Sequence, residues 1–185
     1  MGIKILQKKG FTLVEMVVVI GVISLALPAL FSIIFTMLQQ QTKIYRLSQV
    51  KREGDFALSS IENVIRNYGI GIYTSSTLTT AQCNSKNSSY TNSNFYIKDK
   101  NGSWLIYSIS NNKLSSNSAV LAQPVDLTTS KLIVSNLTFT CSRGEEYPSP
   151  IVFLSFDISY NSGTSTRPED LASMHYQTKI KLRTY

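Results

Sequence analysis

The sequence contains few of the side chains that catalytic and metal sites require. Its 185 residues include two cysteines and a single histidine, His175. No zinc spacing, EF-hand loop or glycine-rich phosphate loop is present, and His175 has no pattern of a nucleophilic site around it. Asp157 and the pair Glu145 and Glu146 are the remaining carboxylate candidates, and the two glutamates lie in a turn-like segment. We therefore expect no enzymatic activity, no cofactor and no metal.

The two cysteines, Cys83 and Cys141, leave two interpretations open. In an exported protein they would form one disulfide that closes a loop of about 58 residues and contributes at most about 4 kcal/mol. In a reducing compartment they would be two buried thiols that pack as small apolar side chains. The sequence alone does not decide between these alternatives.

Excess charge of one sign is also small once the N-terminus is set aside. The formal charge is +7, but Lys4, Lys8 and Lys9 contribute three of those charges. Without them, 15 basic side chains face 11 acidic ones. Such a balance is ordinary for a protein surface and gives little support to nucleic-acid binding.

A long apolar segment without any charge follows the N-terminus. Residues 16–38 are 23 positions that include 14 Leu, Ile, Val or Phe. As a helix they span roughly 35 Å, which is enough to cross a membrane. A secretory signal peptide is the alternative, but its apolar core is usually about 7 to 15 residues long. We predict a membrane anchor with a kink at Pro28, whose orientation the flanking charges do not determine.

Helical spacing continues beyond the anchor to about Tyr68. Gly54 is predicted to interrupt this helix, and Gly69 and Gly71 to end it. Apolar residues recur mostly every three or four positions and predict a buried stripe. These residues are Ile44, Leu47, Phe56, Leu58, Ile61, Val64, Ile65 and Tyr68.

The remainder of the chain is predicted to be a Ser/Thr/Asn-rich loop followed by β-strands. The loop covers residues 73–94, where charge and apolar periodicity are scarce. The Asn-Gly pair at 101–102 predicts a hairpin between two strands at 95–98 and 104–109. Further strands are expected at 114–121, 132–141, 151–160 and 174–182, the last two with one apolar and one polar face.

The segment from Lys8 to Glu15, KKGFTLVE, resembles the signal of the type IV prepilin family. In that family a short basic leader and a glycine precede Phe-Thr-Leu-x-Glu, which opens the anchor helix. The resemblance implies a pilin-like α+β fold, in which a long N-terminal helix packs against a small antiparallel β-sheet. The expected regions are a leader at 1–10, a transmembrane assembly helix at 11–38, an amphipathic helix at 39–68 and the loop and sheet at 69–185.

The resemblance also implies how the chain is processed. A prepilin peptidase and methyltransferase would cut between Gly10 and Phe11 and methylate the new Phe11 amine. The leader would remain cytoplasmic and the C-terminal domain would lie outside the cytoplasm. An acid at the edge of the hydrocarbon is costly unless it is paired. We expect Glu15 to pair with the Phe11 amine of a neighbouring subunit and so to couple subunits during assembly.

These expectations describe a structural subunit, a minor pilin of a type IV pilus-like filament. The alternative is a pseudopilin of a type II secretion or DNA-uptake system. Implied partners are other pilin-like subunits, the peptidase and an inner-membrane assembly platform. The precursor would be a single-pass protein of the cytoplasmic membrane, and the assembled subunit would belong to an extracellular or periplasmic filament.

Contact with nucleic acid or another surface is a further alternative. Lys179, Lys181 and Arg183 alternate along the last strand and would form a basic face. Aromatic residues would add stacking surface if exposed. The same alternation of cations also protects an edge strand from aggregation. The aromatic residues concerned are Tyr73, Tyr90, Tyr96 and Trp104.

Overall fold

The computed structural model describes residues 10–144, 149–165, 167–168 and 170–182. The chain divides into two compact units, Met1–Gln41 and Thr42–Tyr185. One helix and ten strands follow each other along the described residues: α1 (Leu13–Tyr68), β1 (Gly69–Tyr73), β2 (Ala81–Gln82), β3 (Ser88–Asn92), β4 (Tyr96–Asp99), β5 (Trp104–Ser110), β6 (Lys113–Ser118), β7 (Val125–Asp126), β8 (Leu132–Arg143), β9 (Ile151–Tyr160) and β10 (Ser173–Lys181). The predicted α+β class, with a long N-terminal helix packed against antiparallel strands, is confirmed.

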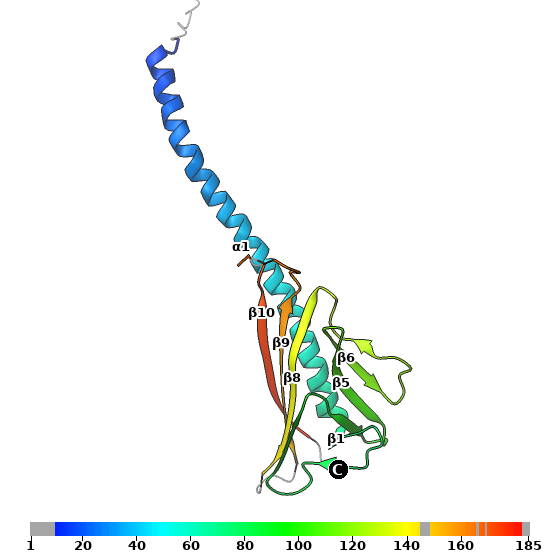
Figure 1. Cartoon of the computed structure of the whole chain (residues 1–185). Helices are drawn as coiled ribbons and strands as arrows, with labels where there is room; N and C mark the ends of the chain where they lie inside the picture. Colours follow the sequence, from blue (N-terminus) through cyan, green and yellow to red (C-terminus); the bar gives the residue numbers. More distant parts are fainter. Residues whose placement is uncertain (1–9, 145–148, 166, 169, 183–185) are drawn as a thin grey trace, which may run out of the picture. The chain divides into compact units, whose positions relative to one another are not determined.

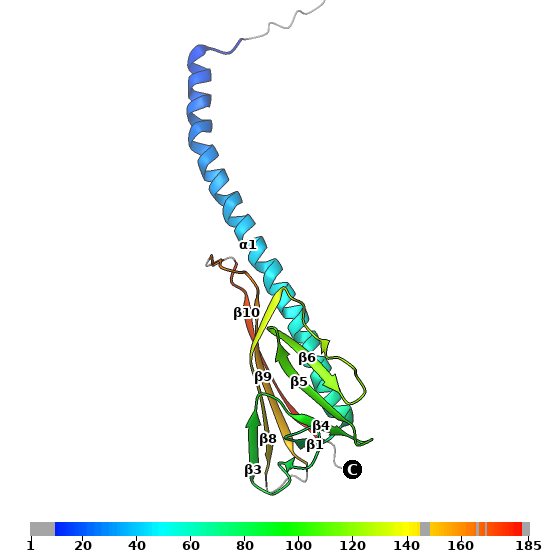
Figure 2. The same ribbon diagram turned by 45° about the vertical axis from the view of Figure 1, so that its right-hand side comes forward.

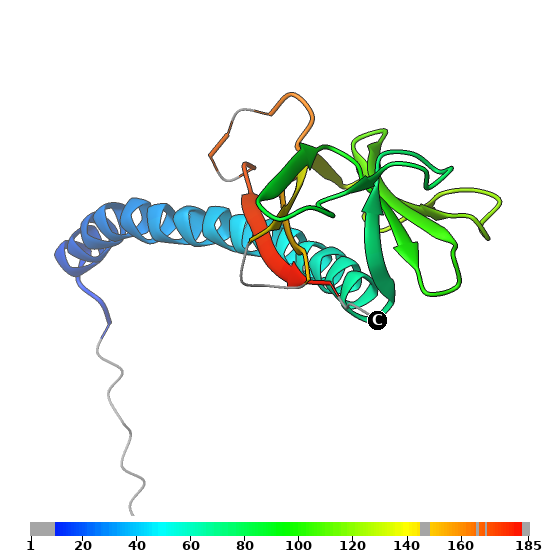
Figure 3. The same ribbon diagram turned by 90° about the horizontal axis from the view of Figure 1, so that it is seen from below.

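The strands form two antiparallel sheets, where one small sheet was predicted. The first has the order β2-β1-β4-β5-β6-β7, and the second has the order β10-β9-β8-β3. Figures 1 and 2 show both sheets beside the C-terminal half of α1. The view from below in Figure 3 shows the strands gathered on one side of that helix segment. The opposite side of the segment is left without a covering sheet.

The Ser/Thr/Asn-rich region was wrongly predicted to be a loop, because it contributes strands to both sheets. Ile72 and Tyr73 of β1 pair with β2 and with β4, and β3 pairs with β8 from Ser88 to Asn92. Between them, Cys83 is joined to Cys141 of β8 in a disulfide whose Cα atoms are 6.2 Å apart. Pairing to distant strands therefore overrides the weak strand propensity of this region.

The later strands agree well with the alternation of the sequence. Val152, Leu154, Phe156 and Ile158 are all buried in β9, and every second residue of β10 is exposed. The predicted hairpin is present, with β4 and β5 joined by a turn in which Gly102 has φ of 82°. The Asp99 side chain accepts hydrogen bonds from the backbone N–H groups of Asn101 and Ser103 and so stabilises this turn.

The helix meets the sheets through a narrower stripe than the one predicted. Val50, Gly54, Ala57, Ile61 and Ile65 are buried on α1 at three- and four-residue spacing. By contrast, three predicted members of the stripe are largely exposed, because only the side that faces the strands is covered. These are Ile44, Phe56 and Tyr68, at 65%, 59% and 54% exposure.

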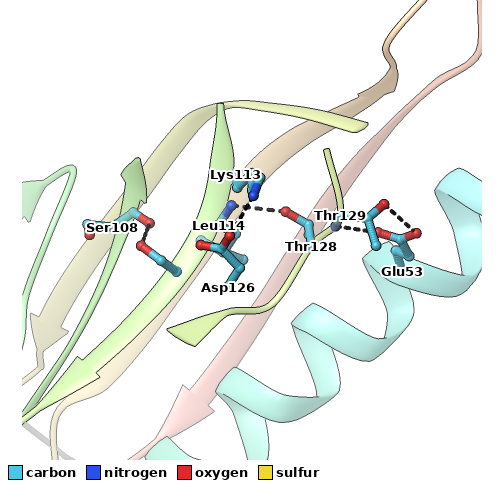
Figure 4. A network of polar contacts seen from close by, with 8 residues as sticks. Glu53, Ser108, Lys113, Leu114, Asp126, Thr128 and Thr129 are labelled. Carbon is cyan, nitrogen blue, oxygen red and sulfur yellow. Dashed lines mark hydrogen bonds and ion pairs between the residues drawn. The ribbon is translucent and has the colours of Figure 1, made fainter. Parts of the chain in front are cut away.

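Polar contacts fix the first sheet and the segment after β7 to the helix, as Figure 4 shows. The backbone N–H and the hydroxyl of Thr129 donate to the two carboxylate oxygens of Glu53, at 2.8 and 3.0 Å. The neighbouring Thr128 hydroxyl accepts from the backbone N–H of Leu114 at 3.0 Å. The bond to Thr128 satisfies a buried backbone donor, the N–H of Leu114, which packing would otherwise leave without water.

Gly54 does not interrupt the helix, and that prediction was wrong. The helix continues to Tyr68, where it ends as predicted. Gly54 is buried because the ring of Tyr176 lies directly against its Cα, and an added Cβ would stand less than 3.0 Å from that ring. The Tyr176 ring stacks on Phe156 and its hydroxyl donates to the carbonyl of Lys51 at 3.1 Å. Burial, assisted by Asp55, raises the pKa of Tyr176 to about 12, so the hydroxyl remains a donor at neutral pH.

We expect Gly54→Ala to lower the free energy of unfolding by about 1 to 3 kcal/mol, the usual cost of overpacking. Alanine is the better helix former by about 1 kcal/mol, but the clash outweighs this gain because Tyr176 is held on both sides. Urea unfolding of the full chain in detergent, followed by Trp104 fluorescence, measures the change. Ser59→Ala, at an exposed position of the same helix, is the matched control. An increase in stability of Gly54→Ala would contradict the packing role.

Candidate functional site

The first turn of α1 begins two residues after the predicted cleavage point. The backbone N–H of Glu15 donates to the hydroxyl of Thr12 at 3.3 Å, and that of Met16 donates to the Thr12 carbonyl at 3.2 Å. Thr12 is therefore the N-cap residue, and Glu15 stands three positions later, as in a capping box. This capping role was not predicted, although the Thr-x-x-Glu pattern was present in the sequence.

Gly10 and Phe11 lie just outside this cap. An added Cβ on Gly10 would meet no atom within 4 Å, so packing within the described residues does not require a glycine there. Phe11 is 74% exposed. Lys8 and Lys9 of the motif, like Lys4, lie outside the described residues. Gly10 and Phe11 are thus both non-helical and directly precede the helix that Thr12 caps.

Glu15 is a solvent-facing carboxylate on the first turn of the helix. The helix dipole favours an acid at this position. Among the described residues, no cationic side chain forms an ion pair with it. Within the part of the chain that the structure describes, the charge of Glu15 is therefore not neutralised by an ion pair.

The helix after Glu15 presents an apolar surface on every side. All residues from Phe11 to Thr42 are exposed, and the candidate membrane span in α1 has a mean hydropathy of 2.7 with none of its window buried. This surface needs lipid or other apolar helices around it, because exposing so many apolar side chains to water is unfavourable. Length, composition and position near the N-terminus support a membrane anchor.

Two hydroxyl groups within this anchor form hydrogen bonds inside the helix itself. The hydroxyl of Ser24 donates to the Ile20 carbonyl at 2.8 Å, and that of Thr36 donates to the Ser32 carbonyl at 2.9 Å. Such bonds to the preceding turn reduce the cost of hydroxyls in hydrocarbon. The helix runs through Pro28, and the kink expected there stays a prediction.

Comparison with known proteins bears on this N-terminal geometry. Residues 6–27 match the family model for the prokaryotic N-terminal methylation motif. The chain carries the type IV prepilin-type signal. No curated protein and no solved structure matches the chain. The prepilin-type signal supports a pilin-like precursor that is processed at its N-terminus, and it implies a peptidase and membrane assembly with other pilins.

His175 and Asp157, which were considered for enzymatic activity, lie next to each other, although no such pair was predicted. His175 does have a carboxylate beside it, because its Nδ1 lies 2.6 Å from Asp157 Oδ1 across the pair β9 and β10. Asn136 Nδ2 donates to the other oxygen of Asp157 at 2.7 Å. The hydrogen bonds from Asn136 and then His175 hold the pKa of Asp157 below its usual value. Sequence reasoning missed this cluster because Asn136 enters it from a β-bulge in β8.

The pair Glu145 and Glu146 lies outside the described residues. Among the described residues, no group of three or more His, Cys, Asp or Glu side chains could hold a metal ion. The prepilin-type signal points to a structural protein of the pilin family.

Where the structure describes them, the residues considered for nucleic-acid contact are divided between the two sheets. Lys179 and Lys181 are exposed on the edge strand β10, while Arg183 lies outside the described residues. The four aromatic residues considered for stacking are half-buried: Tyr73, Tyr90, Tyr96 and Trp104. Tyr96 and Trp104 pack edge to face at 5.6 Å, and the Tyr73 ring lies under Lys98. The aromatic rings are thus used largely within the fold.

Proposed function

We propose that this chain is a minor pilin, a structural subunit of a type IV pilus-like filament. It is made as a membrane-anchored precursor, cut between Gly10 and Phe11 by a prepilin peptidase, and methylated on the new Phe11 amine. The observation that carries the proposal is the prepilin-type signal directly before a capped apolar helix. Because Thr12 supplies the cap, removal of residues 1–10 leaves the start of the helix intact.

Assembly depends on the new charge that cleavage creates. The Phe11 amine of one subunit pairs with the Glu15 carboxylate of a neighbour. At a separation of about 4 Å and an effective dielectric constant of about 20, two unit charges attract by about 4 kcal/mol. Glu15 lacks an ionic partner among the described residues, so it is available to a neighbour. The attraction also sets the axial position of one helix against the next.

The remaining contacts come from the apolar surface of the anchor. When subunits leave the membrane, lipid contacts are exchanged for helix contacts, so the gain comes from packing and not from full hydrophobic transfer. Gly21 supports this interpretation, because no atom lies within 4 Å of a Cβ added there. A small residue that the chain itself does not require lets a neighbouring helix approach closely.

A pseudopilin of a secretion or DNA-uptake system would share the same signal and the same helix. The two-sheet domain, with ten strands among its described residues, is large for a subunit whose only task is to polymerise, and it favours the minor pilin. Counting copies of the chain in purified filaments tests this choice. A few copies per filament are expected, whereas a secretion assembly without an extended pilus would support the pseudopilin.

The decisive experiment is the intact mass of the chain recovered from filaments. We expect residues 1–10 to be absent and one methyl group to be present on the amine of Phe11. Gly10→Val is expected to retain the leader and to stay in the membrane, since Gly10 has no packing role of its own. Thr42→Ser, at an exposed position, is the matched control and is expected to leave cleavage unchanged. Recovery of assembled chains that still carry residues 1–10 would refute the proposal.

A further inference from the structure

An apolar pocket opens on the Thr42–Tyr185 unit, between the end of α1 and the hairpin of β4 and β5. It has a volume of about 160 Å³. An apolar cavity of about 150 Å³ is large enough for a benzene ring, so this pocket has room for one aromatic side chain. Its apolar lining consists of Val64, Tyr68, Ile97, Trp104, Leu105 and Val120.

The lining of the pocket also includes one carboxylate, that of Asp99. Asp99, Ser103 and Ser118 supply its polar atoms. Asp99 is held in place because its Oδ1 accepts from Asn101 N–H at 2.9 Å and Ser103 N–H at 2.7 Å. Tyr68 and Val120 at the edge are 54% and 85% exposed. A suitable ligand therefore combines an aromatic ring with a nearby cation.

The uncovered side of α1 presents this combination. Phe56 is 59% exposed on the helix, and Arg52 stands four positions earlier, on the same face of the helix. Arg52 is exposed and forms no ion pair among the described residues. A phenylalanine left exposed beside an unpaired cation matches the pocket and its carboxylate in size and charge.

We propose that Phe56 of one copy inserts into the pocket of a second copy, with Arg52 facing Asp99. The inference rests on the proposed function and names a surface through which the globular units contact each other. Phe56 with Arg52, here called the knob, and the pocket are different surfaces of one chain. Each copy can therefore insert its knob into one neighbour and accept the knob of another neighbour in its own pocket. Such a heterologous contact joins copies head to tail, so the few copies expected in a filament lie next to one another in one short run.

The spacing of the two surfaces supports a helical arrangement. Phe56 lies eight residues before Val64 and twelve before Tyr68, which is about 12 to 18 Å along the helix axis at 1.5 Å per residue. The knob and the pocket also differ in direction around the axis, because successive residues turn by about 100°. Each contact therefore combines a shift along the helix with a rotation.

Cysteine crosslinking of the full chain tests the contact. The two native cysteines are already joined to each other, so an introduced thiol has no competing free thiol. The double variant Phe56→Cys, Val120→Cys is expected to give a ladder of disulfide-linked multimers in membranes and filaments under mild oxidation. Each single variant is expected to give at least fivefold less crosslinked product. Leu171→Cys with Phe56→Cys, which pairs the knob with an exposed residue outside the pocket, is the matched control.

A second measurement tests the charge pair. Asp99→Asn keeps an acceptor oxygen for the hairpin turn and removes the charge, and Arg52→Gln removes the cation. Each is expected to reduce the ladder about fivefold, and together they should reduce it no further. No ladder, a ladder equal to the control, or crosslinks only to a different pilin-like subunit would overturn the inference. Leader cleavage and incorporation are followed in the same samples, so a normal filament without the ladder refutes this contact and leaves the proposed function intact.

Discussion

Replacing Glu15 with valine is expected to reduce incorporation of the chain into filaments at least tenfold while leaving membrane insertion and leader cleavage unchanged. Valine suits the hydrocarbon better than a carboxylate, so the anchor remains in the membrane. Thr12 still caps the helix through its hydroxyl and its carbonyl, which accept backbone N–H groups that the substitution does not alter. The missing interaction is the one between the Glu15 carboxylate and a neighbour's amine.

The size of the effect follows from the strength of that pair. An attraction of about 4 kcal/mol corresponds to a change of several hundredfold in an equilibrium constant, and desolvation of the two charges reduces this gain. We expect incorporation to fall at least tenfold. The ratio of variant to wild-type chain in sheared filaments, set against the same ratio in membranes, measures it.

Glu15→Gln is the sharper variant, because it keeps the size and polarity of the side chain and removes only its charge. Its incorporation into filaments should fall as that of Glu15→Val does, whereas Glu15→Asp should retain part of the incorporation. If the glutamine variant incorporates normally beside wild-type partners, the acid serves only the helix dipole and the headgroups, and the proposed pair between Glu15 and a neighbour's Phe11 amine is wrong.

Local patterns in the sequence predicted the features that depend on a few neighbouring residues. The signal around Gly10 and the uncharged anchor are such features, and the strands at 151–160 and 174–182 are visible because one face of each is buried. The hairpin at Asn101 and Gly102 follows from turn chemistry. In each case the physical cause lies within one continuous segment of the chain.

The features that were missed depend on contacts between distant segments. From the local sequence Gly54 was predicted to interrupt the helix. The actual reason for a glycine there is close packing of Tyr176, which lies more than a hundred positions later in the chain. The composition of the Ser/Thr/Asn-rich region predicts a loop. Its strands are nevertheless stable because they pair with β4 and β8. Phe56 fits the helical period, but the sheets cover only one side of α1 and leave it exposed.

The Cys83–Cys141 disulfide gives the second large prediction. Replacing both cysteines with alanine is expected to lower the free energy of unfolding by about 4 kcal/mol. The bond closes a loop with a sequence separation of 58, and constraint of the unfolded chain by a loop of this length stabilises the fold by about that amount. Both residues are buried, at 3% and 0% exposure. Urea unfolding of the full chain in detergent measures the loss.

A control separates the bond from the packing of the two side chains. Wild-type chain unfolded and refolded in reductant keeps both sulfur atoms in the core but lacks the bond, so it should lose most of the same free energy. If reduced wild type unfolds at the urea concentration of the oxidised protein, the bond contributes nothing. If only the alanine variant is destabilised, the loss comes from the cavity that the missing sulfur atoms leave.

The same bond also tests the proposed orientation of the chain. Disulfides persist in the periplasm and outside the cell but not in the reducing cytoplasm. Chain that has been processed and assembled should therefore carry an oxidised pair that resists thiol labelling after denaturation. Precursor trapped by Gly10→Val should be oxidised as well, because the anchor, and not cleavage, places the Thr42–Tyr185 unit outside the cytoplasm. Free thiols in membrane-inserted precursor would mean that this unit faces the cytoplasm, and the proposed topology would fail while the signal and the fold would stand.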